Sequence, residues 1–105
     1  MPTIEHDGVL FQVDEEGFLE NAENWCPQWV EYIRQLEEID EMTEDHFELM
    51  ELLRAYHKEH GHPPRVKDMT QVTGFKLKYI YELFPSGPGK GACKMAGLIK
   101  PDGCT

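Results

Sequence analysis

The clearest helical signal lies between residues 43 and 61, in TEDHFELMELLRAYHKEHG. Thr43 has the side chain of an N-cap, and the carboxylates of Glu44 and Asp45 would face the positive end of the helix dipole. Gly61, with Pro63-Pro64 shortly after it, predicts where the helix ends. The predicted apolar face consists of Leu49, Met50, Leu53 and Tyr56. This segment therefore predicts an amphipathic helix that packs by one face.

Helical periodicity continues on both sides of this segment. Upstream, Pro27 suits the first position of a helix, and apolar residues recur with helical spacing at Trp25, Trp29, Ile33 and Leu36. Downstream, we expect a short helix over residues 65–72, a turn at Thr73-Gly74, and another helix. The apolar stripe of that last helix is Leu77, Ile80, Tyr81 and Phe84. Two short helices joined by a glycine-containing turn resemble a helix-turn-helix.

The amino-terminal residues predict a β-hairpin. Residues 3–6 and 9–13 flank Asp7-Gly8, a dipeptide suited to a two-residue turn with positive φ. The predicted fold is therefore mostly α, within the α+β class: a small helical bundle with a helix-turn-helix-like pair and an amino-terminal hairpin. We assign residues 1–84 to the hairpin and helical body.

Residues 85–105 differ in composition from the body. Five glycines and three prolines occur among these 21 residues, and apolar residues are few. Ordering glycine backbone has a high entropic cost, and proline cannot donate to a helix or sheet. The composition predicts a mobile carboxy-terminal arm rather than a core element, and an extended chain of this length would reach at most about 70 Å.

Length and charge narrow the class of protein. A chain of 105 residues fits one small domain. It has no run of about 18 apolar residues and no secretory signal, so we expect a cytoplasmic protein without membrane insertion. The net charge of −10 argues against a general nucleic-acid coat. The charge is uneven: residues 1–62 carry −14 and residues 63–105 carry +4, which is typical of a partner-facing segment.

Three cysteines are present, Cys26, Cys93 and Cys104. Cys26, at a predicted helix start, suits a small buried hydrophobe, although a helix amino terminus can also activate a thiol. Cys93 and Cys104 both lie in the predicted arm. Closing the loop between them would cost on the order of 3 kcal/mol of entropy, which permits a reversible disulfide or longer polysulfur bridge. The carboxylate of Asp102 disfavours a Cys104 thiolate in solution, so we expect Cys104 to become a nucleophile inside a basic cleft of a partner.

The arm LFPSGPGKGACKMAGL (residues 83–98) and KPDGCT (residues 100–105) closely resembles the carboxy-terminal arm of the DsrC/TusE family. The segments DEEGFL (residues 14–19) and TGFKLK (residues 73–78) are also similar, so the resemblance covers nearly the whole chain. In this family the TusE-type members, which relay sulfur for tRNA thiolation, keep only the penultimate cysteine. Both Cys93 and Cys104 are present in this sequence, so the resemblance is to the DsrC branch.

The resemblance implies a sulfur carrier that is a co-substrate of dissimilatory sulfite reductase and not an enzyme itself. Cys104 would accept sulfite-derived sulfur, and Cys93 would be the second thiol of a Cys104/Cys93 trisulfide. The implied partners are the sulfite reductase DsrAB, which carries sirohaem and iron–sulfur clusters, and a membrane-bound complex of the DsrMKJOP type that reduces the trisulfide. No cofactor or metal of the chain's own is implied.

Basic residues of the second half are predicted to contact the partner or an anion: Lys67, Lys76, Lys78, Lys90, Lys94 and Lys100. Two positions depart from the pattern of the family. Ile99 stands where proline is usual, and Lys67 stands where arginine is common, which would weaken a bidentate anion contact.

Three other functions remain open on the residues alone. Lys76 and Lys78 on the helix-turn-helix could bind DNA, although the acidic body would be repelled by phosphates. His57, His60 and His62 could hold zinc, although no zinc motif accompanies them and a solvated helix end explains them. Cys93 and Cys104 could form the redox pair of a thiol oxidoreductase, although such enzymes usually fix the nucleophile at a helix start.

Overall fold

The computed structural model describes residues 2–101. Strand β1 (Thr3–His6) pairs antiparallel with β2 (Val9–Gln12), and Asp7 and Gly8 between them both have positive φ, 51° and 81°. The hairpin prediction is confirmed. Phe11 of β2 packs edge-on against Trp29, with ring centroids 5.1 Å apart, so the hairpin covers the first helix.

Two helices form the frame of the body. After a short 3₁₀ turn, η1 (Ala22–Asn24), helix α1 (Pro27–Leu36) starts at the predicted proline. Helix α2 (Glu44–His60) begins after Thr43, whose side chain accepts from the backbone N–H of His46, while Nδ1 of His46 accepts from the N–H of Thr43. It ends at Gly61 in the left-handed conformation. Both predicted caps of α2 are confirmed.

The helix-turn-helix-like pair is also present. A 3₁₀ turn, η2 (Val66–Asp68), leads into α3 (Met69–Thr73), and Gly74, with φ of 77°, turns the chain into α4 (Leu77–Leu83). The predicted apolar stripes are only partly correct. Ile80 and Phe84 are buried, whereas Leu36, Leu77 and Tyr81 are exposed.

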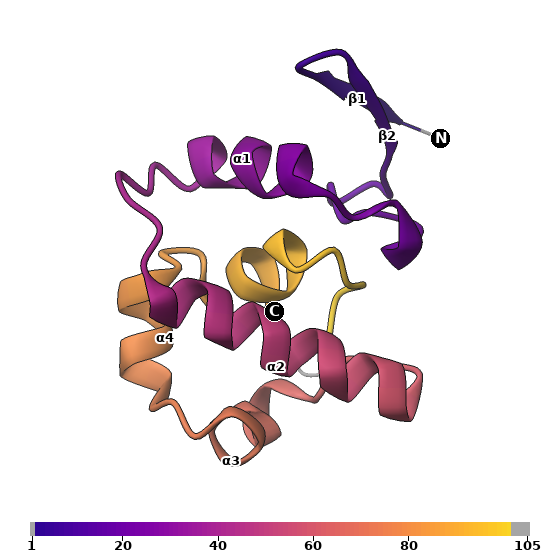
Figure 1. The fold of residues 1–105 in the computed structure, drawn as a ribbon. Helices are drawn as coiled ribbons and strands as arrows, with labels where there is room; N and C mark the ends of the chain where they lie inside the picture. The colour runs from indigo at the N-terminus through magenta and orange to yellow at the C-terminus, as the bar shows by residue number, and fades with distance from the viewer. Residues whose placement is uncertain (1, 102–105) are drawn as a thin grey trace.

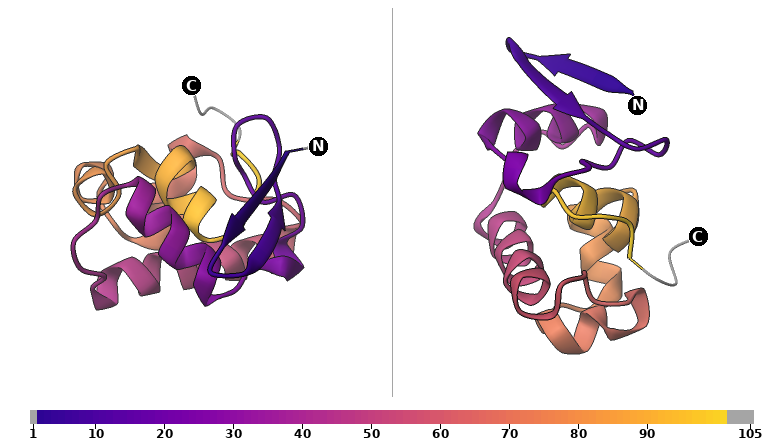
Figure 2. Two further views of the ribbon diagram at one scale, coloured as in Figure 1. Left: turned by 90° about the horizontal axis from the view of Figure 1, so that it is seen from above. Right: turned by 90° about the vertical axis from the view of Figure 1, so that its right-hand side faces the viewer.

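The predicted arm is not an arm as far as the structure describes it. Residues 88–93 form a π-helix, η3 (Pro88–Cys93), and the helix continues to Met95. It lies between α1 and α2 at the centre of the molecule, as the yellow segment in Figures 1 and 2 shows. Its buried residues include Ala92, Cys93, Met95, Ala96 and Leu98. The prediction of an arm is therefore wrong for residues 85–101, which pack onto the body formed by 1–84 and contribute several residues to its core. Residues 102–105 lie outside the described part.

Close packing explains why this core helix is rich in glycine. A Cβ atom on Gly91 would lie 2.7 Å from Cβ of Phe84 and 2.9 Å from a carboxylate oxygen of Glu37. The missing side chain therefore lets η3 approach α4 and the end of α1 closely. The composition predicted a mobile segment, but in the structure the absence of a Cβ atom on glycine permits close packing of the backbone.

Among the described residues, no helix is both long and apolar enough to span a membrane.

Candidate functional site

Cys93 is the last residue of η3 and its side chain is fully buried, with 0% exposure. Single π-turns are rare in proteins and occur often at functional sites. The sulfur atom lies in the main hydrophobic cluster, which also contains Ala92 and Met95. The second thiol of the predicted pair thus lies in the buried interior of the described structure.

A Schellman turn closes the helix that carries Cys93. Gly97 has φ of 77°, and its N–H donates to the carbonyl of Lys94 over 3.1 Å. The N–H of Leu98 donates to the carbonyl of Cys93 over 3.0 Å. This pair of hydrogen bonds defines the motif. The backbone of Cys93 is consequently bound to the residue five positions further along the chain.

Three side chains from other elements complete the cap of this helix. We call them the clamp: Trp25, Trp29 and Arg54. Each donates to one carbonyl of the last turn: Trp29 Nε1 to Lys94 (2.7 Å), Trp25 Nε1 to Met95 (2.9 Å) and Arg54 Nη1 to Ala96 (2.7 Å). The Arg54 guanidinium also lies 4.2 Å from the centroid of the Trp25 ring. The four carbonyls that an α-helical end normally leaves unpaired are all satisfied here.

The segment that leads into η3 is held by the carboxylate of the residue that follows α1. Glu37 accepts a hydrogen bond from the N–H of Ser86 over 3.0 Å and another from its hydroxyl over 2.6 Å. Negative charge is favourable at this end of a helix. The helix that carries Cys93 is therefore fixed at both ends by side chains that are distant in sequence.

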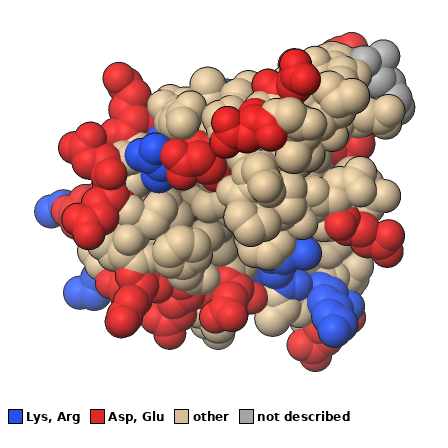
Figure 3. Space-filling model, turned by 45° about the horizontal axis from the view of Figure 1, so that its top comes forward, with Lys and Arg blue, Asp and Glu red and all other residues tan. Residues whose placement is uncertain are grey.

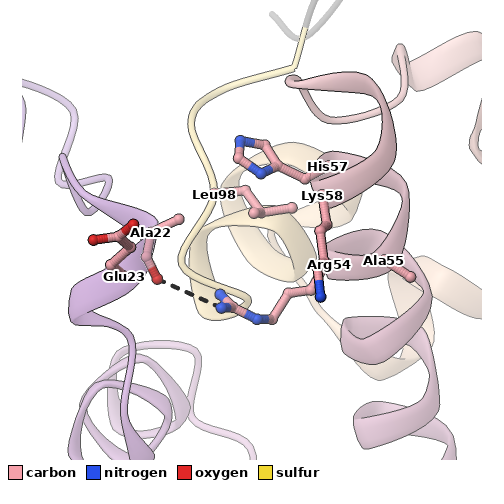
Figure 4. A pocket seen from close by; sticks show the side chains of 7 residues that line it. All are labelled: Ala22, Glu23, Arg54, Ala55, His57, Lys58 and Leu98. Carbon is pink, nitrogen blue, oxygen red and sulfur yellow. Dashed lines mark hydrogen bonds between the residues drawn. The ribbon is translucent and has the colours of Figure 1, made fainter.

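A basic cleft opens beside the last described segment of the chain. Its volume is about 470 Å³, and Figure 4 shows α2 on one side, η1 on the other and Leu98 between them. The residues that line it are Ala22, Glu23, Arg54, Ala55, His57, Lys58 and Leu98. Arg54 reaches across towards the carbonyl of Ala22, 3.5 Å from Nη2, whereas the Glu23 carboxylate points away from α2.

The electrostatic environment of the cleft is positive. Partial burial lowers the pKa of Arg54 from its usual value. Burial also lowers the pKa of His57, and the charges of Arg54 and His62 lower it further. No salt bridge joins Arg54 or Lys58 to a carboxylate among residues 2–101.

The predicted lysines do not converge on one site. Lys94 Nζ donates to the carbonyl of Glu16 over 3.0 Å, and Lys100 Nζ lies 3.2 Å from the carboxylate of the same residue. The others are exposed on separate elements: Lys67 on η2, Lys76 and Lys78 at α4, and Lys90 on η3. Figure 3 shows acidic side chains spread over one face, with basic ones in separate spots.

The other cysteines and the histidines named in the sequence analysis do not form a further site among the described residues. Cys104 lies outside the described residues. Cys26 is half-buried as the N-cap residue of α1. In the part of the chain that the structure describes, no cluster of His, Cys, Asp or Glu could hold a metal ion. His60 stacks on Tyr56, with ring centroids 4.1 Å apart.

Sequence reasoning missed the basic cleft. It interpreted His57 as part of a solvated helix end and assigned no role to Arg54 or Lys58. Their spacing of three and four residues was the available signal, since it places them on one face of α2. The opposite wall of the cleft comes from residues distant in sequence, and no pattern in the chain indicates that wall.

Comparison with known proteins agrees with this architecture. The family described as "DsrC like protein" matches residues 5–105. The chain is 52% identical to the dissimilatory-type sulfite reductase subunit gamma of Nitratidesulfovibrio vulgaris, across 99% of both chains. It is 32% identical to the sulfurtransferase TusE of Yersinia pestis, across 96% of this chain and 98% of the relative.

Two solved structures are similar along their whole length. One is a crystal structure of dissimilatory sulfite reductase I (DsrI), with 51% identity, a TM-score of 0.88 and coverage of 99% of this chain and 100% of that one. The other is the oxidized gamma-subunit, DsrC, from Archaeoglobus fulgidus, with 35% identity, a TM-score of 0.80 and the same coverage. Because the family model matches residues 5–105 and the similarity to these relatives extends along nearly the whole chain, this protein belongs to the DsrC family.

Proposed function

We propose that the protein is a sulfur carrier and a co-substrate of dissimilatory sulfite reductase, without catalytic turnover of its own. The observation that carries the proposal is the presence of both Cys93 and Cys104 in a chain that is 52% identical to a sulfite reductase gamma subunit. In this proposal Cys104 accepts the sulfur and Cys93 closes a trisulfide around it.

The chemistry balances with two sources of electrons. Sulfite, the two thiols, two electrons from the reductase and four protons give the trisulfide and three water molecules. The thiols themselves supply two further electrons as they are oxidised. The trisulfide then takes four electrons and four protons from a membrane-bound reductase and releases hydrogen sulfide and both thiols. The proposed partners are accordingly DsrAB, whose sirohaem and iron–sulfur clusters handle sulfite, and a DsrMKJOP-type complex.

The burial of Cys93 gives this cycle a conformational step. Cys93 has no exposed surface, so a reactant from solution reaches its thiol only when the end of η3 opens locally. Local opening costs less free energy than global unfolding and is common in functional segments. Burial therefore protects the second thiol from other reactants.

The second thiol also favours this role over the relay of sulfur for tRNA thiolation. A relay passes a persulfide from one cysteine to the next and needs one thiol in each carrier. A carrier that releases sulfide needs a second thiol to complete the two-electron step. The 32% identity to TusE makes the relay of sulfur the second candidate function.

The proposal is tested by intact-mass measurements after reaction with purified DsrAB, sulfite and a low-potential electron donor. The wild-type chain is expected to gain one sulfur atom and lose both alkylatable thiols of the pair. Cys93→Ser should gain sulfur as a persulfide that a thiol reductant removes, and Cys104→Ser should gain none. Cys26→Ser is the matched control and should behave as wild type. Sulfur loading of Cys104→Ser equal to wild type would overturn the assignment.

A further inference from the structure

The basic cleft concentrates positive charge in a strongly acidic protein. The chain has a net charge of −10, yet three of the residues that line the cleft, Arg54, His57 and Lys58, are basic side chains from one face of α2. The one acidic residue of the lining, Glu23, directs its carboxylate away from them. Basic groups gathered around a hollow with no carboxylate among them produce a focused positive potential.

Arg54 retains hydrogen-bonding capacity in this cleft. A guanidinium has five N–H donors. Arg54 uses Nη1 for the carbonyl of Ala96 over 2.7 Å, and Nη2 has only a 3.5 Å contact with the carbonyl of Ala22. Both acceptors are neutral, so the clamp fixes the guanidinium in place without neutralising its charge. A partly buried charge is stabilised further when an anion supplies the missing partner.

We propose that the basic cleft, formed by Arg54, His57 and Lys58 on α2 with Leu98 at its wall, binds a small oxoanion. The choice of sulfite as the physiological ligand rests on the proposed function, whereas the binding of an oxoanion rests on the cleft alone. An anion held there lies against Leu98, six positions before Cys104 in the sequence. The cleft would thus keep a charged sulfur species next to the segment that leads to the sulfur-accepting thiol.

A carboxylate of the chain itself could bind the basic side chains of the cleft in place of a free oxoanion. Asp102 follows directly after Pro101, the last described residue, and a carboxylate also accepts charge-assisted hydrogen bonds from a guanidinium. The experiment therefore includes the variant Asp102→Asn. If the cleft is open to free anions, this variant leaves their binding unchanged.

The measurement is an NMR titration of the reduced, full-length chain under anaerobic conditions, observed at the ring protons of His57. Sulfite and sulfate are added separately, and sodium chloride at matched ionic strength controls for screening. A bound oxoanion should also raise the pKa of His57, because its negative charge favours the protonated ring. The basic groups around His57, which are Arg54, Lys58 and His62, act in the opposite direction. Glu23, on the other wall of the cleft, is the acidic group. The pKa is therefore measured with and without sulfite.

Three variants separate binding from folding. Arg54→Gln should abolish the saturable shift, but it also removes a bond of the clamp. Lys58→Gln, at an exposed position, leaves the clamp intact and should weaken sulfite binding by about tenfold, the typical value of one charge-assisted contact. Lys67→Gln, an equal change of charge at an exposed site on η2, should have no effect.

The expected result is a saturable shift at His57 with both oxoanions and none with chloride, reduced in Lys58→Gln and retained in Lys67→Gln and Asp102→Asn. Equal responses to chloride and sulfite, or equal affinities in Lys58→Gln and Lys67→Gln, would overturn the proposal. It would also fail if Asp102→Asn alone shifted His57 and strengthened sulfite binding, because the carboxylate would then be the occupant. Sulfur loading of Cys104 by DsrAB is measured in a separate experiment. A failure of anion binding and a failure of sulfur loading can therefore be distinguished.

Discussion

Arg54 and Ala96, which are 42 residues apart, are joined by a 2.7 Å hydrogen bond from Nη1 of the guanidinium to the backbone carbonyl. The bond places a positive charge at the carboxy-terminal end of the helix that carries Cys93, where cations are favourable. The same guanidinium lines the basic cleft. One side chain therefore links the stability of the cysteine helix to the electrostatics of the neighbouring cleft.

Replacing Arg54 by methionine tests the contribution of this bond to stability. Arg54→Met keeps much of the apolar stem but removes the donor to Ala96 and the charge over the Trp25 ring. We expect the free energy of unfolding to fall by about 1–3 kcal/mol, as for other lost charge-assisted hydrogen bonds. Urea denaturation measures this. Lys58→Met, one turn later on the same face of α2 but at an exposed position, should change stability by less than about 0.5 kcal/mol.

Two of the glycines that end helices form a natural comparison. Gly61 and Gly97 have similar positive φ values, 82° and 77°. A Cβ atom at Gly61 would meet nothing within 4 Å, whereas one at Gly97 would lie 2.6 Å from Cδ1 of Trp25. We expect Gly61→Ala to cost about 1 kcal/mol for the backbone conformation alone. Gly97→Ala should cost about 1–3 kcal/mol more, because the clamp must move.

Equal urea midpoints for the two alanine variants would contradict the close contact between Gly97 and Trp25. Circular dichroism of both variants in the absence of urea controls for a general loss of helix.

The burial of Cys93 predicts slow chemistry at its sulfur in the folded state. In a Cys26→Ser, Cys104→Ser background, alkylation of Cys93 should be on the order of 100-fold slower in the native protein than in urea, since it requires local opening. Trp29→Phe removes the 2.7 Å bond to the carbonyl of Lys94 and should accelerate the native reaction. Mass spectrometry of quenched samples gives both rates. If Cys93 were alkylated as fast in the native protein as in urea, its thiol would be accessible to solvent and the prediction would be contradicted.

The lowered pKa of His57 predicts a contribution to acid sensitivity. Burial, Arg54 and His62 disfavour the protonated ring in the folded state. The unfolded chain, with an ordinary histidine pKa of about 6.5, therefore binds this proton more readily. The resulting destabilisation is absent well above that pH and grows as the pH falls through it.

The variant His57→Gln removes this titration. Between about pH 7.5 and pH 5.5, its free energy of unfolding should fall less steeply than that of the wild type. His60→Gln, at an exposed position of the same helix, is the control. A steeper fall in His57→Gln would reverse the sign of the prediction.

Local rules predicted the body of the fold. The turn at Asp7-Gly8, the N-cap at Thr43 and the stop at Gly61 are contacts within a few residues, and the sequence displays them directly. The stripes were less accurate at Leu77 and Tyr81, because a short helix near the surface exposes part of any apolar set. The spacing of apolar residues predicts that a helix has an apolar face, but it does not predict how much of that face other elements bury.

The interpretation of residues 85–101 failed for a physical reason. Glycine content was equated with a mobile chain, whereas Gly91 and Gly97 allow the helix to approach Phe84 and Trp25 closely. The partners that make ordering favourable are far away in sequence, and the indole groups of Trp25 and Trp29 satisfy the helix end. A single sequence does not display contacts of this range. Both cysteines are candidates on the sequence alone, and that choice stays a prediction; the sequence does not indicate the burial of Cys93.

The buried position of Pro101 limits how far from the domain Cys104 could carry a sulfur atom in the proposed function. Only residues 102 and 103 lie between Pro101 and Cys104, and the three steps from Pro101 to Cys104 cover at most about 10 Å when the chain is fully extended. A partner whose reaction centre lies deeper than this must either come into direct contact with the domain or draw residues 98–101 out of their packing. Extraction of that segment would break the Schellman turn and release Cys93 at the same moment, so the depth of the partner's centre and the availability of the second sulfur would be mechanically coupled.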